Sequence, residues 1–360
     1  MKFFTMPSFL VMSGHHSAGD SICQRTRLCC KLDSARPNHH NTFMDPYHAP
    51  EGHRSGFVAL AGKPNVGKST LINQVLKQPI AAVSARPQMT RKTQLGILTL
   101  PMAQLIFVDT PGLHQPQHKL GQQLNEEALE GLENADAILI LFDLETPPST
   151  EDDQVADHIR QLKDSKPLLI ALNKIDRVPA DRLADRSSAY RRLLPDIPAL
   201  GISALNGDSV DELIQMLIEL VPEGPRLYPE DALTLTYERD IAADLIRAAA
   251  LEYLRDEVPH AVAIRIDTFK ERDEHGAYIE ATLFVERDSQ KGIVIGKGGA
   301  MLKRIGTHAR KAIEQVLDRK SYLELRVKVL PNWRNDPHAL QQFGFQATTN
   351  ESSTPTKGKR

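Results

Sequence analysis

Residues Gly62-Lys-Pro-Asn-Val-Gly-Lys-Ser69 form the most informative stretch of this sequence. They match the pattern G-x-x-x-x-G-K-[ST]. They lie between an apolar run typical of a buried strand, Phe57–Ala61, and a segment with helical periodicity, Lys68–Leu76. The glycines let backbone N–H groups wrap around phosphates, and the amino end of the helix adds a positive dipole. So short a pattern also arises by chance, but its position between a strand and a helix favours a phosphate-binding loop.

The loop residues have distinct expected roles. We expect Lys68 to reach the β- and γ-phosphates of a nucleoside triphosphate and the hydroxyl of Ser69 to bind Mg²⁺. The other expected contacts to the nucleotide come from Gly62, Lys63, Pro64, Asn65, Val66, Gly67 and Thr70.

A second motif, Asp109-Thr-Pro-Gly112, closes another apolar run 40 residues after Ser69. A carboxylate at the end of a strand can hold the water shell of a magnesium ion, and the backbone N–H of Gly112 can donate a hydrogen bond to the γ-phosphate. D-x-x-G alone is typical of a plain turn, but its distance from Ser69 favours a nucleotide contact. This motif adds Asp109, Thr110, Pro111, Gly112 and Leu113 to the expected site.

A third motif, Asn173-Lys-Ile-Asp176, predicts which base is bound. The carboxylate of Asp176 can accept hydrogen bonds from N1–H and N2–H₂ of guanine, whereas adenine would leave it desolvated and unpaired. Asn173, Lys174 and Ile175 brace the loop and cover the base, and a backbone N–H at Ser203-Ala204 can recognise guanine O6. Together, the motifs predict binding and hydrolysis of GTP, with GDP as product, and exclude an ATP-dependent kinase or ATPase.

The surrounding pattern predicts an α/β fold. Apolar runs alternate with periodic segments, which requires a mostly parallel sheet with helices on both faces. The expected strands are Phe57–Ala61, Leu105–Asp109, Ala137–Asp143, Pro167–Asn173 and Ala199–Ser203, and the expected helices are Lys68–Leu76, Lys119–Glu133, Glu151–Lys163 and Val210–Leu220. A Pro- and Gly-rich cluster at Val221–Pro225 then breaks the chain. We therefore expect a nucleotide-binding domain at 55–222 and a linker at 223–236.

The C-terminal part has a different order of elements. Helix Ile241–Glu257, strands Ala261–Lys270 and Ala277–Val285, a short helix, a glycine-rich turn, helix Ala300–Leu317 and strand Tyr322–Leu330 are expected. This order, with Gly296-Lys-Gly-Gly299 between two helices, resembles the smaller α+β type II KH domain, whose G-x-x-G loop clamps about four nucleotides of RNA. G-x-x-G alone is typical of a plain turn between helices. We expect this domain to span 237–345.

Local charge supports an RNA-binding function for this domain. Residues 287–334 hold 12 Lys and Arg against 4 Asp and Glu, a net of +8 in a chain of net charge −2. An apolar wall at Ile293, Val294 and Ile295 stands where unstacked bases would lie, and Trp333 either stacks on a base or packs in the core. The expected RNA contacts are Lys291, Gly296, Lys297, Gly298, Gly299, Lys303 and Arg304.

The two ends of the chain differ from the rest. Residues 1–54 contain scattered His, Ser, Asn and Pro, and we interpret them as a disordered or mis-started extension rather than a targeting peptide. Residues 346–360 are expected to be a disordered tail. All three cysteines (Cys23, Cys29 and Cys30) precede residue 31, which excludes a disulfide-stapled secreted fold and indicates a cytoplasmic protein. No apolar run is long enough to cross a bilayer.

The motifs together resemble the Era family of translation-factor-like GTPases with a C-terminal KH domain. The resemblance covers roughly residues 55–345 and includes Arg86-Pro-Gln-Met-Thr90-Arg91, Val294-Ile-Gly-Lys-Gly-Gly299 and Leu323-Glu-Leu-Arg-Val-Lys328. It implies that Thr90 closes on Mg²⁺ in the GTP state, with Thr93 as a competing ligand. Lys68, Thr90 and Gly112 are therefore the expected catalytic residues.

Two residues within the motifs bear on the mechanism of hydrolysis. Leu113 stands where Ras-like enzymes place a water-orienting Gln, so we expect slow intrinsic hydrolysis. Asn65 resembles an Asn that ligates K⁺ beside the phosphates in potassium-dependent relatives. A K⁺ ion could replace an arginine finger electrostatically, and the alternative role for Asn65 is shaping of the loop.

The resemblance also implies partners. These are 16S ribosomal RNA near its 3′ end and the 30S ribosomal subunit during its maturation, together with a peripheral contact on the inner face of the cell membrane. No DNA partner is expected. The alternative function is a GTPase that signals to a protein or membrane partner while the KH-like domain is structural.

Overall fold

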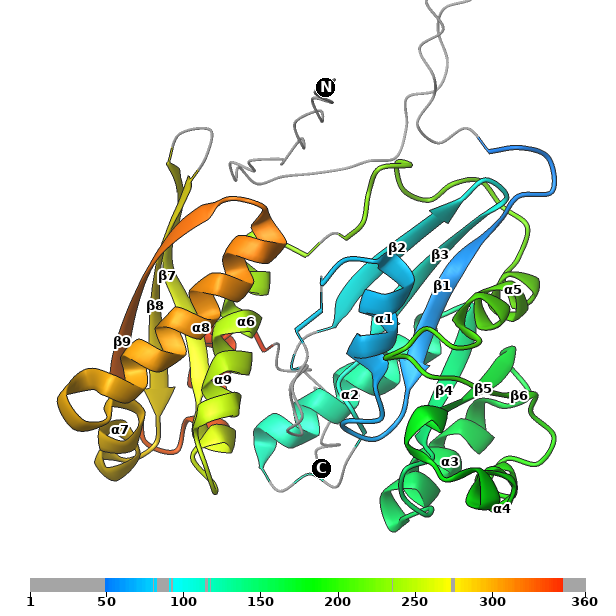
Figure 1. Ribbon diagram of the computed structural model, residues 1–360, viewed down its shortest axis with the longest axis horizontal. Helices are drawn as coiled ribbons and strands as arrows, with labels where there is room; N and C mark the ends of the chain where they lie inside the picture. The colour runs from blue at the N-terminus through cyan, green and yellow to red at the C-terminus, as the bar shows by residue number, and fades with distance from the viewer. Residues whose placement is uncertain are drawn as a thin grey trace, which may run out of the picture. The chain divides into compact units, whose positions relative to one another are not determined.

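The computed structural model describes residues 49–345 except 80, 83–90, 92, 114, 115, 117, 235 and 273–275. The predicted extension (apart from residues 49–54), the predicted tail and Thr90 therefore lie outside the described residues. The helices and strands form two groups around separate sheets (Figure 1). No described helix is long and apolar enough to span a bilayer.

The first sheet has six strands in the order β2-β3-β1-β4-β5-β6. Its strands are β1 (Arg54–Ala61), β2 (Gln94–Leu100), β3 (Ala103–Asp109), β4 (Ala137–Asp143), β5 (Leu168–Asn173) and β6 (Ala199–Gly201). β2 pairs antiparallel with β3, and the other pairings are parallel. The register aligns Leu60 with Asp109 and Asp143 with Asn173, so polar residues from neighbouring strands meet at one edge of the sheet.

Helices cover both faces of this sheet (Figure 1). Helices α1 (Lys68–Leu76) and α5 (Val210–Leu220) pack into one apolar cluster with the sheet. Helices α2 (Lys119–Asn134), α3 (Thr150–Leu162) and α4 (Ala180–Arg191) pack into a second cluster on the other face. The strands between them are buried on both sides, which is why they read as continuous apolar runs.

The second sheet has three strands in the order β7-β8-β9. β7 (Ala263–Arg272) pairs antiparallel with β8 (Gly276–Val285), and β8 pairs parallel with β9 (Lys320–Val329). Helices α6 (Glu238–Tyr253) and α8 (Ala300–Leu317) contact each other and cover one face of this sheet (Figure 1). The short helices α7 (Asp288–Ile295) and α9 (Pro337–Gln342) complete the unit.

The predicted fold class is confirmed, and several elements differ from those predicted, among them helix α9, which was not predicted. Strand β2 was not predicted because Gly96 interrupts its apolar pattern. A Cβ at Gly96 would lie 2.9 Å from side-chain atoms of Ile72 and Leu76 on α1, so the glycine is needed for close helix packing. Helix α4 was also missed, because Tyr190 is its only buried residue and it lacks an apolar stripe. Helix α6 ends at Tyr253 rather than Glu257, and Asp256 beyond it is left-handed with φ 55°. The domain limits remain predictions.

Candidate functional site

The loop between β1 and α1 has the conformation that its glycines permit. Gly62 and Gly67 have φ of 150° and 105°, and Asn65 is left-handed at 66°. A Cβ on Gly67 would lie 2.3 Å from Nδ2 of Asn173, and one on Gly62 would lie 2.7 Å from a backbone oxygen of Leu141. The loop is therefore closed against its neighbours, with room for glycine alone at these positions.

Lys68 is buried at the base of this loop. Its Nζ donates to the carbonyl oxygens of Gly62 at 3.0 Å and Lys63 at 3.2 Å. Burial lowers the pKa of Lys68 to about 8, and the nearby carboxylate of Asp109 opposes that shift. A buried ammonium held mainly by neutral carbonyl groups is a site that gains from an anionic ligand.

The second motif lies directly beside the loop. Asp109 is fully buried at the end of β3, and the Ser69 hydroxyl donates to its Oδ2 at 2.7 Å. Gly112 approaches the loop so closely that a Cβ on it would lie 2.7 Å from the backbone nitrogen of Pro64. Thr110 instead donates its hydroxyl to the carbonyl of Leu60 at 2.8 Å, which ties the end of β3 to β1. The structure thus brings together the residues expected around Mg²⁺ and the γ-phosphate.

Asn173 joins three segments of the expected site. From the end of β5, its Nδ2 donates to the carbonyl of Val66 in the phosphate loop at 2.7 Å. Its Oδ1 accepts from the backbone N–H of Ala204 at 2.9 Å, and both bonds are buried. These two hydrogen bonds are the kind of contact that we expect of a residue that braces the loop. The N–H of Ala204 has a partner within the protein, so its contact to guanine O6 remains a prediction.

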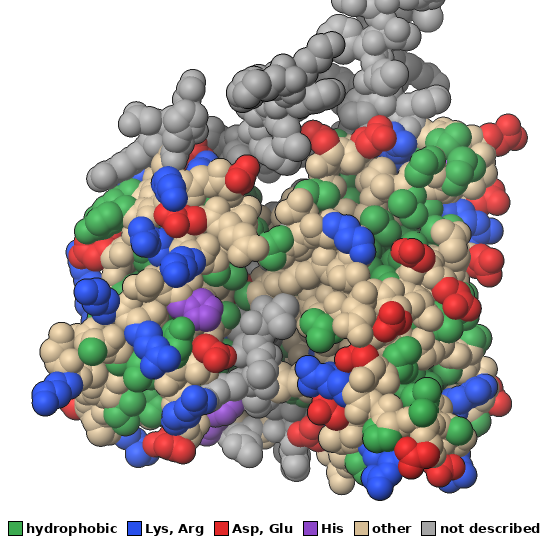
Figure 2. All heavy atoms as spheres, in the orientation of Figure 1, with side chains coloured by type: hydrophobic (Ala, Val, Ile, Leu, Met, Phe, Trp, Pro, Cys, Tyr) green, Lys and Arg blue, Asp and Glu red, His purple; other side chains and the backbone are tan. Residues whose placement is uncertain are grey.

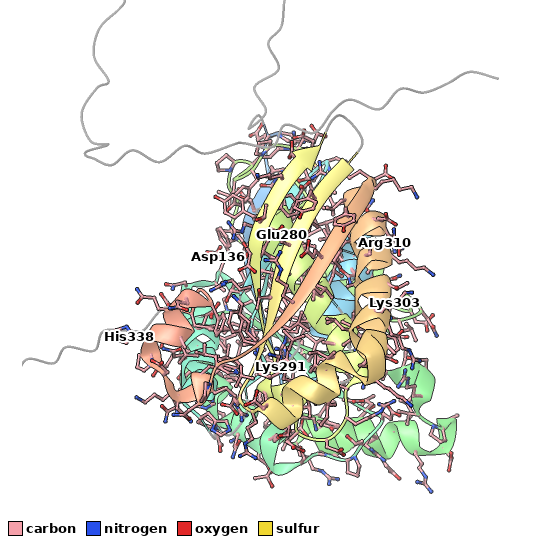
Figure 3. All side chains as sticks on the ribbon, turned by 90° about the vertical axis from the view of Figure 1, so that its left-hand side faces the viewer. Asp136, Glu280, Lys291, Lys303, Arg310 and His338 are labelled. Carbon is pink, nitrogen blue, oxygen red and sulfur yellow. The ribbon has the colours of Figure 1, made fainter. Side chains whose placement is uncertain are left out.

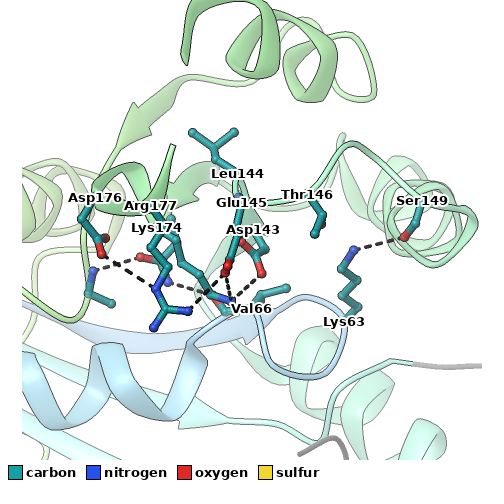
Figure 4. Close-up of polar contacts among 12 residues, drawn as sticks. Lys63, Val66, Asp143, Leu144, Glu145, Thr146, Ser149, Lys174, Asp176 and Arg177 are labelled. Carbon is teal, nitrogen blue, oxygen red and sulfur yellow. Dashed lines mark hydrogen bonds and ion pairs between the residues drawn. The ribbon is translucent and has the colours of Figure 1, made fainter. Parts of the chain in front are cut away.

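Lys174 and Asp176 follow Asn173 in the loop predicted to bind the base (Figure 4). Lys174 is left-handed with φ 66°, and its ammonium contacts Asp143 at 2.5 Å and Glu145 at 3.7 Å. Asp176 keeps its carboxylate beside Arg177, with Nε and Oδ2 4.0 Å apart. The ion pairs hold the loop against the segment that follows β4, a role that sequence reasoning did not assign to Asp143 or Glu145.

Lys63 has a function in the loop that the sequence did not indicate. Its Nζ donates to Oδ2 of Asp152 at 2.6 Å and to the hydroxyl of Ser149 at 3.1 Å (Figure 4). Asp152 is fully buried and belongs to the capping box at the start of α3. The phosphate loop is therefore fixed to α3 through a buried carboxylate. The sequence showed the lysine within the motif but did not indicate its partner, because Asp152 lies 89 residues further on.

A second missed residue, Arg91, immediately follows the segment that contains Thr90. Its buried guanidinium donates to the carbonyls of Val262 at 3.0 Å and His260 at 3.2 Å. It also lies over the Trp333 ring, 5.5 Å from the centroid. Burial lowers the pKa of Arg91 well below its usual value, and the nearby Arg247 adds to the effect. The nucleotide-binding part of the chain thus contacts the segment before β7, and Trp333 after β9, through a side chain next to a predicted switch.

The glycine-rich turn after α7 has left-handed backbone at three positions. Gly296, Gly298 and Gly299 have φ of 72°, 59° and 82°. A Cβ on Gly298 or Gly299 would meet nothing within 4 Å, whereas one on Gly296 would lie 2.7 Å from Cβ of Met301. Gly298 and Gly299 are therefore needed for their backbone conformation and leave open space in front of the turn, as a clamp for phosphates requires.

Basic side chains surround this turn. Lys297, Lys303 and Arg304 are exposed and Lys291 is half-buried. Lys and Arg side chains gather on the surface over α8 (Figure 2). Lys303 and Arg310 project from α8, and Lys291 lies on α7 (Figure 3). The expected RNA contacts are thus close together on α7, the turn and α8.

The structure corrects one expectation about apolar residues and decides between the two roles considered for Trp333. Val294 is fully buried in the core under α7 and cannot contact a base, whereas Ile293 is 49% exposed. Trp333 is fully buried, donates its Nε1–H to the carbonyl of Ala261 at 2.8 Å and packs edge-on against Phe343. Of the two roles considered for Trp333, packing is the one that the structure shows.

Comparisons with known proteins agree with this geometry. A family model described as "50S ribosome-binding GTPase" matches residues 57–174, and one described as "KH domain" matches residues 257–334. GTPase Era of Ruminiclostridium cellulolyticum is 42% identical over 298 residues, which cover 83% of this chain and 99% of that protein.

Two solved structures share the fold, each with a TM-score of 0.77 and 37% identity over 82% of this chain and 100% of theirs. One is Era in complex with MgGDPNP and nucleotides 1506–1542 of 16S ribosomal RNA. The other is a single-substitution variant of Aquifex aeolicus Era bound to GDP·AlF₄⁻. With a relative this similar over nearly its whole length, the chain belongs to the Era family and is a GTPase with a KH domain.

Proposed function

We propose that this GTPase binds the 3′ end of small-subunit ribosomal RNA through its KH domain and acts in assembly of the 30S subunit. GTP binding and hydrolysis would switch that contact on and off. The support comes from a family relative that holds a nucleotide analogue and 16S ribosomal RNA together, and from the G-x-x-G turn of this chain. The cytoplasm is where this function would place the protein.

The nucleotide site fits a triphosphate with Mg²⁺. The buried ammonium of Lys68 would exchange its carbonyl acceptors for phosphate oxygens, and Asp176 would accept the two donors of guanine. The Ser69 hydroxyl, already beside buried Asp109, would ligate the metal directly while the carboxylate holds its water shell. Bound Mg²⁺ supplies charge neutralisation at the phosphates. Thr90 would complete this shell.

We propose that the attacking water is oriented by the backbone, by another residue or by a partner, and not by the residue after Gly112. Leu113 is buried in the apolar cluster on one face of the sheet and has no group that can orient water. The Gly112 N–H, close to Pro64, would hold the γ-phosphate. Slow turnover without a partner is expected.

The proposal includes a K⁺ ion held by Asn65 in the phosphate loop. The left-handed backbone of Asn65 sets its place in the loop, and bound K⁺ would supply positive charge beside the phosphates. Turnover in KCl and in NaCl tests this, with a matched Asn65→Ala variant. A higher rate in KCl that Asn65→Ala abolishes supports the ion, whereas equal rates in the two salts discard it.

One observation carries the RNA part of the proposal. At Gly298 and Gly299 the backbone is left-handed and nothing lies within 4 Å of the Cβ positions, so the main chain is open to a phosphate. Gly298→Asp places a carboxylate in that space. Because Asp tolerates left-handed backbone better than most residues and has room here, the fold should persist while the phosphate is repelled.

The test measures binding to an RNA that spans nucleotides 1506–1542 of 16S ribosomal RNA. Gln341→Asp is the matched control, since it adds the same charge at an exposed position on α9. We expect Gly298→Asp to weaken RNA binding at least about 100-fold with GTP affinity unchanged, and the control to bind like wild type. Unchanged RNA binding by Gly298→Asp would instead favour a GTPase that signals to a protein or membrane partner.

A further inference from the structure

Helix α2 packs against both parts of the fold. Its buried stripe contains four residues at four-residue spacing: Leu120, Leu124, Ala128 and Leu132. The first two belong to an apolar cluster that the KH domain forms around Trp333. The last two pack in the cluster that α3 and α4 form with the first sheet. The amino end of α2 therefore rests on the KH domain and its carboxyl end on the GTPase sheet.

The KH domain also caps the start of α2. The first N–H groups of a helix have no acceptor within that helix, and a side-chain oxygen that accepts from one of them stabilises it. His118 precedes α2, and its side chain makes no such bond in the described structure. The Oδ1 of Asn335 instead accepts from the backbone N–H of Lys119 at 3.3 Å. A residue 216 positions further along the chain thus supplies a capping acceptor.

The side chain of Asn335 is held in place by its own turn. Its Nδ2 donates to Oδ1 of Asn332 at 2.8 Å, and its backbone N–H donates to the Asn332 carbonyl at 3.0 Å. Trp333, in the same turn, is fully buried and donates to the carbonyl of Ala261. Because the turn is fixed to the core of the KH domain, the oxygen that contacts α2 has a defined position.

Helix α2 is linked to both segments that are predicted to close on the nucleotide. Six residues separate its first residue, Lys119, from Gly112. In the middle of the helix, the carboxylate of Glu127 accepts from the backbone N–H of Thr93 at 2.6 Å, and Thr93 is three residues after Thr90. The position of α2 therefore affects where the chain on either side of the phosphates can lie.

We propose that the turn Trp333–Asn335 positions α2 for GTP hydrolysis, with Asn335 as a positioning residue that acts through the helix rather than on the nucleotide. Hydrolysis needs Gly112 at the γ-phosphate and Thr90 at Mg²⁺ together, and misplacing a reacting group by about 1 Å can cost about 100-fold in rate. A helix fixed at both ends leaves these segments less freedom than a helix fixed at its carboxyl end alone. The KH domain is then part of the GTPase machinery even when no RNA is bound.

Three substitutions of Asn335 test this role, with single-turnover hydrolysis and GTP affinity measured separately and without RNA. Asn335→Ala removes the acceptor and should slow hydrolysis about fivefold, the rate equivalent of one helix cap, with GTP affinity unchanged. Asn335→Asp keeps an acceptor and adds negative charge at the positive end of the helix dipole, so it should be at least as fast as wild type. Exposed Asn332 can turn its amide to donate to the new carboxylate. Asn335→Lys should be the slowest, because it puts positive charge at that end.

Asn134→Ala is the matched control, because it makes the same change at an exposed position at the other end of α2, and it should hydrolyse GTP like wild type. Equal rates for wild type and Asn335→Ala would show that α2 needs no support from the KH domain, which overturns the proposal. An Asn335→Asp protein as slow as Asn335→Ala, or a loss of GTP affinity as large as the loss of rate, would also overturn it. Since no RNA enters these measurements, failure of the proposed RNA function would leave their result unchanged.

Discussion

Replacing Asn173 with Ala should weaken both the fold and nucleotide binding. The change removes two buried hydrogen bonds and leaves the carbonyl of Val66 and the N–H of Ala204 without that partner. Each buried group deprived of its partner costs about 1–3 kcal/mol. Because a water molecule can occupy part of the space that the amide leaves, we expect a total of about 3 kcal/mol rather than the full sum.

The assay is urea denaturation of nucleotide-free protein, followed by titration with a fluorescent GTP analogue. The expected loss of unfolding free energy is about 3 kcal/mol. GTP affinity should fall at least about tenfold, because Lys174 and Asp176 follow directly in the loop that Asn173 anchors. Asn134→Ala is the control, since it makes the same change at an exposed position on α2. A loss below about 1 kcal/mol for Asn173→Ala, or one equal to the control, would refute this reasoning.

Three further predictions follow from individual contacts. Asp176→Asn should weaken GTP binding at least about 100-fold and admit xanthosine triphosphate, and undiminished GTP preference in competition titrations would contradict the base-recognition argument. At a pH of about 8.5 the free protein holds Lys68 largely deprotonated, since its pKa is lowered to about 8, whereas phosphates raise that pKa again. GTP binding should therefore take up as much as about one proton, as measured by calorimetry in buffers of different ionisation enthalpy. The Lys68→Arg variant shows how many protons the nucleotide itself takes up. Equal proton uptake by both proteins would exclude Lys68 as the group that is protonated. Arg91→Ala removes one donor to each of the carbonyls of Val262 and His260, and Val262 keeps a second donor, Arg247. The change should cost about 2 kcal/mol of unfolding free energy, with no rescue by Lys, which lacks the planar fork. Full stability in denaturant would disprove this prediction.

The site was predictable where its chemistry is local in sequence. The phosphate loop, Asp109–Gly112 and Asn173–Asp176 each follow a buried strand, and parallel strands bring their ends to one edge. Contacts between distant segments could not be predicted. Lys63 with Asp152, and Arg91 with Val262, depend on packing of elements 89 and 171 residues apart.

The fold was predictable where apolar periodicity is strong. Strand β2 was not predictable because Gly96, which the close approach of α1 requires, weakens its apolar pattern. Helix α4 was not predictable because it buries a single residue, Tyr190, and its other positions are largely polar. Trp333 could not be assigned between RNA stacking and packing, because an aromatic residue suits both and only burial distinguishes them.

Crosslinking in cells followed by sequencing of the bound RNA tests the central proposal most directly. Wild-type protein should crosslink near the 3′ end of small-subunit ribosomal RNA, with the contact at the glycine-rich turn lost in Gly298→Asp and kept in Gln341→Asp. Crosslinks spread over unrelated RNAs, or the same crosslinks from wild type and Gly298→Asp, would contradict it.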